Sequence, residues 1–132
     1  LTVYQPGNQS RNYVHVDDIA RAYVRSAERM SDQLAAGETG VEKYEIASEE
    51  DPSVIMVAEK VRELSKEILG REGEIQLVDN PRSGETLVED FTVDTTRARN
   101  RLDWEPQHTV EESIRDLLRR RAKELPSQKR AA

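Results

Sequence analysis

The chain has 132 residues, of which 36% are hydrophobic and 35% charged, and its 26 acidic and 20 basic residues give a net charge of −6. Because coating a phosphate backbone needs a basic excess, this balance predicts no nucleic-acid partner. The absence of cysteine excludes disulfides, thiolate metal sites and cysteine nucleophiles. No apolar run approaches the ~20 residues of a membrane span and no signal peptide is visible, so we expect a cytoplasmic protein with no membrane partner.

The first 40 residues are predicted to contain two short strands and a helix. Residues 1–4 form a β-rich run that ends at the turn residues 6–8, and residues 13–16 form a second run rich in β-branched and aromatic residues. The acidic pair at 17–18 offers capping oxygens to a helix that runs from residue 20 to the glycines at 37 and 40. The apolar stripe of this helix consists of Tyr23, Val24, Ala27, Met30 and Leu34.

The middle of the chain is predicted to contain a second helix between two strands. Residues 44–47 form the first of these strands. Asp51 can cap a helix that has Pro52 in its first turn and that stops at Gly70. Residues 74–78 alternate in polarity as a strand does. The buried face of the helix is predicted to consist of Val54, Val57, Ala58, Val61, Leu64 and Ile68.

The last third is predicted to add one strand and two helices. A polar loop covers residues 79–85, residues 91–93 form a short strand, and Thr95 begins a short helix that ends at Leu102. Trp104, at the break that follows, is interpreted as a core anchor. A final helix begins at residue 110, and its predicted apolar face consists of Ile114, Leu117, Leu118 and Leu125.

This order of elements predicts a mixed α/β fold in which about four helices cover a small mixed sheet or paired strands. A complete doubly wound nucleotide-binding fold needs more strands than these. Residues 1–126 are expected to form one region and residues 127–132 a frayed tail. Because the sequence starts at Leu1 in what reads as the middle of a strand, we expect the region to belong to a longer protein.

The sequence contains no recognisable catalytic centre. Its glycines at 7, 37, 40, 70, 73 and 84 do not form a G-x-G-x-x-G phosphate-binding loop. A tyrosine–lysine pair four residues apart could transfer protons, but the residues four after the tyrosines are Asn8, Asp17, Ala27 and Ser48. We therefore expect no catalytic residue in this chain.

Residues 7–20, GNQSRNYVHVDDIA, place an arginine just before a predicted strand whose end caps a helix. This segment resembles a motif of the extended short-chain dehydrogenases/reductases, the NAD-dependent epimerase/dehydratase family. The resemblance continues, in the family's order, at residues 1–4, 44–47, 82–85, 94–98, 102–106 and 111–118. The chain departs from the family at Gln5–Pro6 and at Asp103, where glycine is usual, and at Ser83, where proline is usual. The resemblance implies that this chain is the carboxyl-terminal, substrate-binding part of such an enzyme.

The resemblance implies that Arg11 and Arg82 contact the diphosphate of a nucleoside diphosphate sugar from two separate loops. The chemistry agrees, since the planar guanidinium fork matches phosphate oxygens and each charge-assisted hydrogen bond contributes about 1.5–3 kcal/mol. The alternative is that each arginine is solvated or pairs with a nearby acid. A metal site at His15, Asp17 and Asp18 is likewise weaker than a strand followed by a helix cap, and no metal is predicted.

Four further residues take part in the implied substrate site. Glu85 matches the acid that accepts hydrogen bonds from ribose hydroxyls, and Val3 and Tyr4 match the strand beside the base. Gln9 is assigned to the edge of the sugar or phosphate. Tyr4 is equally consistent with plain sheet packing. The basic run at 119–121 is interpreted as cations at the negative end of a helix dipole, not as a nucleic-acid site.

These features predict an intact parent that acts on nucleotide sugars with NAD or NADP, most simply as a uridine-diphosphate-hexose 4-epimerase. The cofactor and the proton-transfer pair would belong to an amino-terminal domain missing from this chain, which alone would bind no cofactor and show no turnover. The alternatives are a non-catalytic nucleotide-binding or regulatory module and an interaction domain. Because the face that docks on the missing domain would be bare and apolar, we also expect a possible homodimer.

Overall fold

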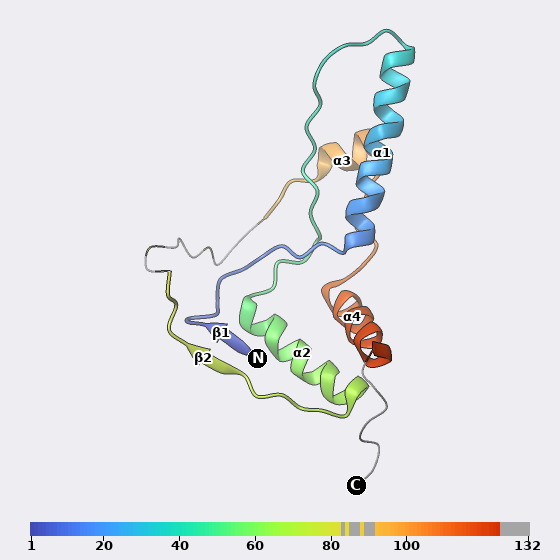
Figure 1. Ribbon diagram of the computed structural model, residues 1–132. Helices are drawn as coiled ribbons and strands as arrows, with labels where there is room; N and C mark the ends of the chain where they lie inside the picture. Colours follow the sequence, from blue (N-terminus) through green and yellow to red (C-terminus); the bar gives the residue numbers. More distant parts are fainter. Residues whose placement is uncertain (83, 85–87, 89–91, 125–132) are drawn as a thin grey trace. The chain divides into compact units, whose positions relative to one another are not determined.

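The computed structural model describes residues 1–82, 84, 88 and 92–124. The described residues form six elements, shown in Figure 1: β1 (Thr2–Tyr4), α1 (Val16–Ala35), α2 (Val54–Leu69), β2 (Gln76–Val78), α3 (Thr96–Leu102) and α4 (Val110–Glu124). They divide between two compact units. The strand unit comprises residues 1–11, 52–90 and 110–132, and the tryptophan unit comprises residues 12–51 and 91–109. The predicted class, a small sheet with four helices, is confirmed for the described part of the chain.

The strand unit is built on a parallel ribbon of β1 and β2, in which Val3 pairs with Leu77. Parallel strands need a long crossover connection, and here the connection between β1 and β2 contains α2. Val3 is buried and packs near Gly7, where a Cβ atom would lie 3.1 Å from Val3 Cγ1. Gly7 also has a φ of +79°, so the turn after β1 requires glycine for both space and backbone conformation.

Helix α2 begins and ends at well-defined caps. The side chain of Ser53 accepts a hydrogen bond from the Met56 N–H, so the predicted cap at Asp51 is wrong and the helix starts two residues later than expected. Gly70 ends the helix in the left-handed conformation, as predicted. The predicted buried face is confirmed, with Ala58 and Leu64 buried and its other members half-buried.

Helix α4 lies beside α2 in the strand unit (Figure 1). Ion pairs join the two helices, with Arg115 Nη1 2.6 Å from Glu67 Oε1 and Lys60 Nζ 3.2 Å from Glu111 Oε2. Ile114 is buried as predicted, but Leu117 is 66% exposed, so the predicted apolar face of this helix is only partly correct. Leu125 lies outside the described residues.

The tryptophan unit packs α1 and α3 around Trp104, which is 1% exposed. Its buried cluster consists of Ala22, Ala98, Leu102 and Trp104, with Tyr44 and Ile46 half-buried against it. The prediction that Trp104 anchors the core at a helix break is confirmed. Asp103, in the left-handed conformation (φ 49°), caps α3 and turns the chain so that the indole points inward.

Three predicted strands differ from the structure. Val16 is the first residue of α1, so residues 13–16 do not form a strand, and residues 44–47 belong to no strand or helix. The strand predicted over residues 74–78 is shorter than expected, since only Gln76–Val78 pairs with β1. A strand needs a hydrogen-bonding neighbour, and within the described residues neither 13–16 nor 44–47 has one. Phe91 is outside the described residues, so the strand predicted at 91–93 stays a prediction.

Within the described part of the chain, no helix is both long enough and apolar enough to span a membrane.

Candidate functional site

The two arginines assigned to the diphosphate follow neighbouring strands of one ribbon. β1 and β2 run parallel, and the ladder continues past β1 through a 2.9 Å hydrogen bond from Gln5 N to Val78 O. The carboxyl ends of the two strands therefore lie at the same edge, which is where open parallel sheets bind ligands. The loops that leave this edge carry Arg11 and Arg82 (Figure 1 shows both connections).

The loop that carries Arg11 is held against the start of α2 by its backbone. Ile55 N donates to Gly7 O at 2.9 Å, and Val54 N donates to Gln9 O at 3.1 Å. Arg11 N donates to Pro52 O at 3.3 Å, and this bond and the one from Val54 form an isolated antiparallel bridge between Ser10 and Ser53. Three backbone hydrogen bonds therefore hold this loop against the start of α2, so its side chains leave from defined positions.

Among the predicted site residues that the structure describes, Gln9 is the most deeply buried after Val3. Gln9 is only 6% exposed, and within the described residues its Oε1 atom has no hydrogen-bond partner. A buried acceptor left without a donor costs about 1–3 kcal/mol. The Oε1 atom of Gln9 is therefore an acceptor without a donor that the surrounding residues enclose.

The remaining predicted site residues lie in different environments. Val3 is 4% exposed and buried as a whole residue, whereas Tyr4 is 45% exposed. Arg11 is half-buried and its Nη1 donates to Ser10 O at 3.0 Å. Arg82 is exposed, and its backbone N–H donates to Asn80 Oδ1 at 2.9 Å in a side-chain-capped turn. Glu85 lies outside the described residues, and the convergence of the two guanidinium groups stays a prediction.

Asp18 has a structural role that sequence reasoning missed. It was predicted to cap a helix, but the cap of α1 is His15, whose Nδ1 accepts the Asp17 N–H at 3.1 Å. The Asp18 carboxylate is fully buried and accepts hydrogen bonds from Gln107 N and His108 N, both at 3.1 Å, and from Arg21 Nη2 at 3.0 Å. Neighbouring residues gave no signal of this role, because its partners Gln107 and His108 lie far away in the sequence.

The environment of Asp18 determines its ionisation. Burial by itself raises the pKa of the carboxyl, but the hydrogen bonds from the His108 ring and from the backbone of Gln107 and His108 favour the charged form and bring the pKa below its ordinary 3.8. The indole Nε1 of Trp104 donates to the backbone oxygen of Asp18 at 2.9 Å. Asp18 therefore ties α1 to the segment after α3, and its role is structural.

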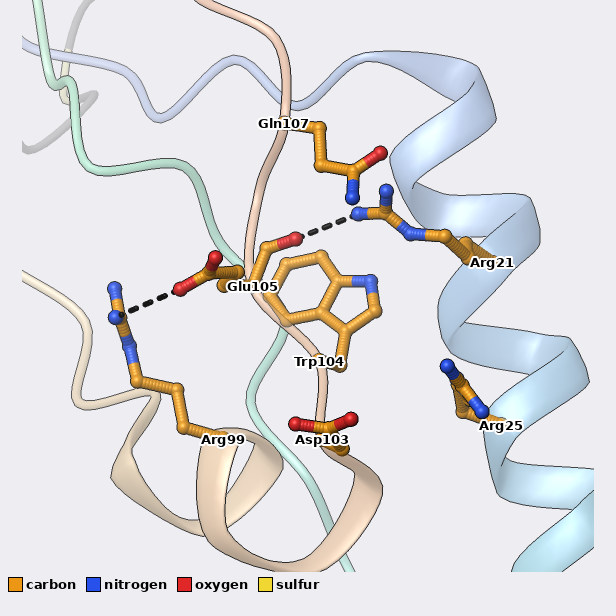
Figure 2. Close-up of a pocket in the computed structure, with 7 residues that line it drawn as sticks. All are labelled: Arg21, Arg25, Arg99, Asp103, Trp104, Glu105 and Gln107. Atoms are coloured by element: carbon orange, nitrogen blue, oxygen red, sulfur yellow. Dashed lines mark hydrogen bonds and ion pairs between the residues drawn. The ribbon is translucent and has the colours of Figure 1, made fainter.

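A pocket of about 450 Å³ lies beside Trp104 in the tryptophan unit (Figure 2). Figure 2 shows three arginines around it, Arg21, Arg25 and Arg99. Arg21 Nη2 donates to Glu105 O at 2.6 Å, Arg99 Nη1 lies 3.5 Å from Glu105 Oε2, and Arg25 pairs with an acid in its own helix. Because each cation is already matched within the chain and the Asp103 carboxylate also lines the pocket, we assign no anion to it.

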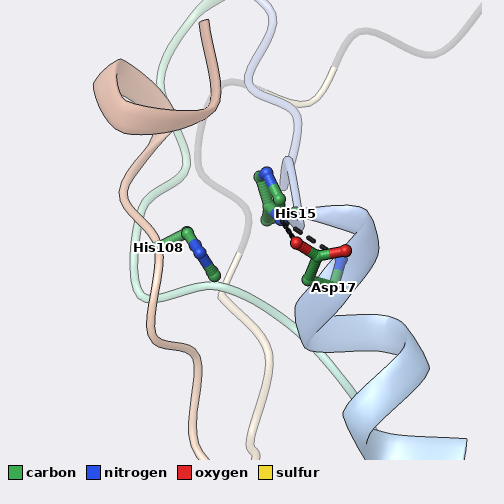
Figure 3. A group of neighbouring side chains, drawn as sticks. All are labelled: His15, Asp17 and His108. Atoms are coloured by element: carbon green, nitrogen blue, oxygen red, sulfur yellow. Dashed lines mark hydrogen bonds and ion pairs between the residues drawn. The ribbon is translucent and has the colours of Figure 1, made fainter. Parts of the chain in front are cut away.

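His15, Asp17 and His108 place possible metal-ligand atoms within 4.8 Å of one another (Figure 3). The two imidazole rings are stacked, with centroids 4.0 Å apart and an interplanar angle of 18°. A metal ion lies in the plane of each imidazole that binds it, and two nearly parallel stacked rings cannot direct their lone pairs at one ion. Each Nδ1 atom also has a hydrogen-bond contact, that of His108 at 3.1 Å from Asp18 Oδ1, so this geometry favours packing and capping.

Comparison with known proteins places these features in context. No protein-family model matches the chain. A rice (Oryza sativa subsp. japonica) protein provisionally assigned as GDP-L-fucose synthase 2 is 33% identical over 119 residues, a match that covers 90% of this chain and 30% of that protein. The chain thus spans about a third of the length of the relative that it matches.

Solved structures of two epimerases are also similar to this chain over most of its length. The UDP-glucose 4-epimerase of Thermotoga maritima, determined with UDP-glucose, is 28% identical with a TM-score of 0.67, and the match covers 95% of this chain and 36% of that one. The UDP-glucose 4-epimerase of Bifidobacterium longum, determined with NAD+ and UDP, is 20% identical with a TM-score of 0.70, covering 92% of this chain and 34% of that one. The latter likeness is one of fold. The described elements match the carboxyl-terminal part of the Thermotoga enzyme.

Proposed function

We propose that this chain binds the nucleoside diphosphate sugar on which an NAD-dependent epimerase/dehydratase acts. The chain belongs to this family of extended short-chain dehydrogenases/reductases and corresponds to the carboxyl-terminal part of its members. The supporting observation is that Arg11 and Arg82 leave the same edge of a parallel two-stranded ribbon. Two cations from separate loops at one edge suit a ligand with two linked phosphates, because each guanidinium can form a bidentate pair with phosphate oxygens.

The other site residues have roles that follow from their surroundings. Tyr4 would contribute its exposed ring beside the base, and the strand at Val3 would hold Tyr4 in place. Gln9 would accept a hydrogen bond from a hydroxyl of the ligand, which would satisfy its buried Oε1. Glu85 would receive ribose hydroxyls. These contacts position the substrate and transfer no proton, so the contribution of this chain to catalysis would be orientation.

The residues of this chain do not fit a dinucleotide cofactor. The sequence has no glycine-rich loop for a pyrophosphate, and its parallel ribbon has two strands where a dinucleotide-binding sheet has many more. NAD or NADP would therefore be held elsewhere in the enzyme, in a cofactor-binding domain that partners this chain. No reaction step is assigned to a residue of this chain.

A uridine diphosphate hexose is the substrate class that we favour, and 4-epimerisation the reaction. The Thermotoga structure contains UDP-glucose and is 28% identical, whereas the rice relative is named for a guanosine nucleotide. A non-catalytic nucleotide-binding or regulatory module would use the same ribbon edge. The two functions differ in turnover, which the module would lack even when a cofactor-binding domain and NAD are supplied.

The test is a titration of the chain with UDP-glucose by isothermal calorimetry or ligand-observed NMR. We expect Arg11→Ala and Arg82→Ala each to weaken binding about tenfold to a hundredfold, because each removes about 1.5–3 kcal/mol of charge-assisted hydrogen bonding. Arg71→Ala is the matched control, since it removes the same charge from an exposed position after α2. If all three variants bind UDP-glucose as the wild type does, or all three lose affinity equally, the proposed diphosphate contact of Arg11 and Arg82 is contradicted.

A further inference from the structure

The side chain of Asn12 binds the backbone of a turn that begins 36 residues further along the chain. Its Oδ1 accepts the Ser48 N–H at 2.8 Å, and its Nδ2 donates to Ser48 O at 3.0 Å and to Glu50 O at 3.2 Å. Only one orientation of the amide permits all three bonds, because the reversed amide would direct its NH2 group at the Ser48 N–H. Asn12 therefore pairs with both backbone groups of Ser48, as a residue of a neighbouring strand would.

The turn that Asn12 binds is held in shape by contacts of its own. Ser48 is buried, at 9% exposed. Its Oγ donates to Glu50 O at 2.8 Å and accepts the Glu50 N–H at 3.4 Å, which is the kind of turn that a serine side chain stabilises. Asn12 is itself half-buried. Its three bonds therefore reach a backbone whose conformation is already restrained.

Arg11 is the residue directly before Asn12, and its guanidinium group follows the backbone at this point. Arg11 N donates to Pro52 O at 3.3 Å, and Arg11 Nη1 donates to Ser10 O at 3.0 Å. The place of the guanidinium depends on the peptide groups around residue 11, because it bonds to one of them. Asn12 restrains the chain immediately after these peptide groups.

We infer that Asn12 is a positioning residue, which binds the turn at Ser48 so that Arg11 is ordered before a diphosphate binds. The inference rests on the proposed function of Arg11. A side chain that is ordered in advance loses less conformational freedom when the ligand arrives, so it contributes more to affinity. The amide is required because the turn offers one N–H and two carbonyl oxygens, and a carboxylate has no hydrogen to donate to the two oxygens.

The first test needs no ligand and measures amide hydrogen exchange by NMR in the wild type, Asn12→Ala and Asn12→Asp. We expect the Ser48 and Arg11 amide hydrogens to exchange at least about tenfold faster in both variants, because the restraint on each is lost. The Ile55 N–H donates to Gly7 O at the other end of the same loop and should keep its wild-type rate.

Asn100 provides the matched control, since it is exposed on α3 and allows the same two substitutions. Neither substitution there should alter exchange at Arg11. Unchanged exchange of the Arg11 amide in the Asn12 variants would overturn the inference. Faster exchange throughout the chain, with loss of helix content by circular dichroism, would show that Asn12 maintains the fold in general and would also contradict it.

The second test separates an effect through Arg11 from a general loss of structure. Asn12→Ala should weaken UDP-glucose binding about twofold to tenfold, as expected when one flexible side chain must be ordered on binding. The loss should disappear in an Arg11→Ala background, which has no guanidinium left to position, and should persist in an Arg82→Ala background. A loss of equal size in all three backgrounds would contradict the positioning role.

These measurements also distinguish this inference from the proposed function. If Arg11→Ala weakens UDP-glucose binding and Asn12→Ala does not, the proposed function stands and the positioning role is wrong. If the wild-type chain does not bind UDP-glucose, the proposed function is wrong, and the role of Asn12 in diphosphate binding is wrong with it, even where hydrogen exchange shows that Asn12 restrains Arg11.

Discussion

Asp18 and His108 are joined twice although they lie ninety residues apart: Asp18 Oδ2 accepts the backbone N–H of His108 at 3.1 Å, and Asp18 Oδ1 lies 3.1 Å from His108 Nδ1. The same carboxylate also accepts the Gln107 N–H and the Arg21 guanidinium. One buried anion therefore satisfies donors from α1 and from the segment after Trp104. The tryptophan unit depends on this residue more than on any surface ion pair.

Replacing Asp18 with asparagine should destabilise the tryptophan unit by about 3 kcal/mol. The amide keeps the size of the side chain but removes the charge and replaces one acceptor oxygen with a donor that faces donors. The measurement is chemical denaturation followed by the fluorescence of Trp104, the single tryptophan. Asp17→Asn, at an exposed neighbour, is the control and should cost less than about 1 kcal/mol. A cost for Asp18→Asn no larger than that of the control would contradict the structural role.

Stability should fall with acid because of the same carboxyl. Its pKa in the folded chain lies below the ordinary 3.8, so the folded state favours the ionised form. The stabilisation is fully present above about pH 4, where the unfolded carboxyl is also ionised, and is lost as the pH falls through the lower folded value. Denaturation midpoints measured from pH 6 to pH 2 should decline less in Asp18→Asn than in the wild type. Parallel declines in the two proteins would contradict this assignment.

Glu42 should titrate well below an ordinary glutamate. Hydrogen bonds from Arg29, at 2.6 and 2.9 Å, and from the Tyr44 hydroxyl lower its pKa to about 2. We expect Arg29→Met to raise the Glu42 pKa toward 4.5, measured by carboxyl NMR titration. Arg25→Met is the control, since Arg25 pairs with Glu28 instead. An unchanged Glu42 in Arg29→Met would show that the pair does not persist in solution.

Asp103→Gly should stabilise the chain. Asp103 adopts φ 49° at the cap of α3, a left-handed conformation that costs a residue with a Cβ atom about 1 kcal/mol relative to glycine. Thermal unfolding should therefore shift upward by a few degrees, as expected for about 1 kcal/mol in a chain of this size. A lower midpoint would mean that the Asp103 side chain makes a compensating contact.

The sequence by itself was enough to locate the helices. The 3.6-residue spacing of apolar residues and the glycine at position 70 placed α2 within a few residues, and Thr95 correctly marked the start of α3. These features depend on neighbours along the chain, which a sequence displays directly. The order of the motifs likewise predicted the family and the part of it that this chain matches.

Pairing and burial were decided only by the tertiary structure. A β-rich segment becomes a strand only where another lies alongside, which is why residues 76–78 pair with β1 while residues 44–47 do not pair within the described part of the chain. Asp18 looked like a local cap because its partners, Gln107 and His108, are remote in sequence and close only after folding. The predicted apolar stripe of α1 is likewise exposed, with Tyr23 at 74% and Leu34 at 68%, because an apolar stripe indicates a face but not what covers it.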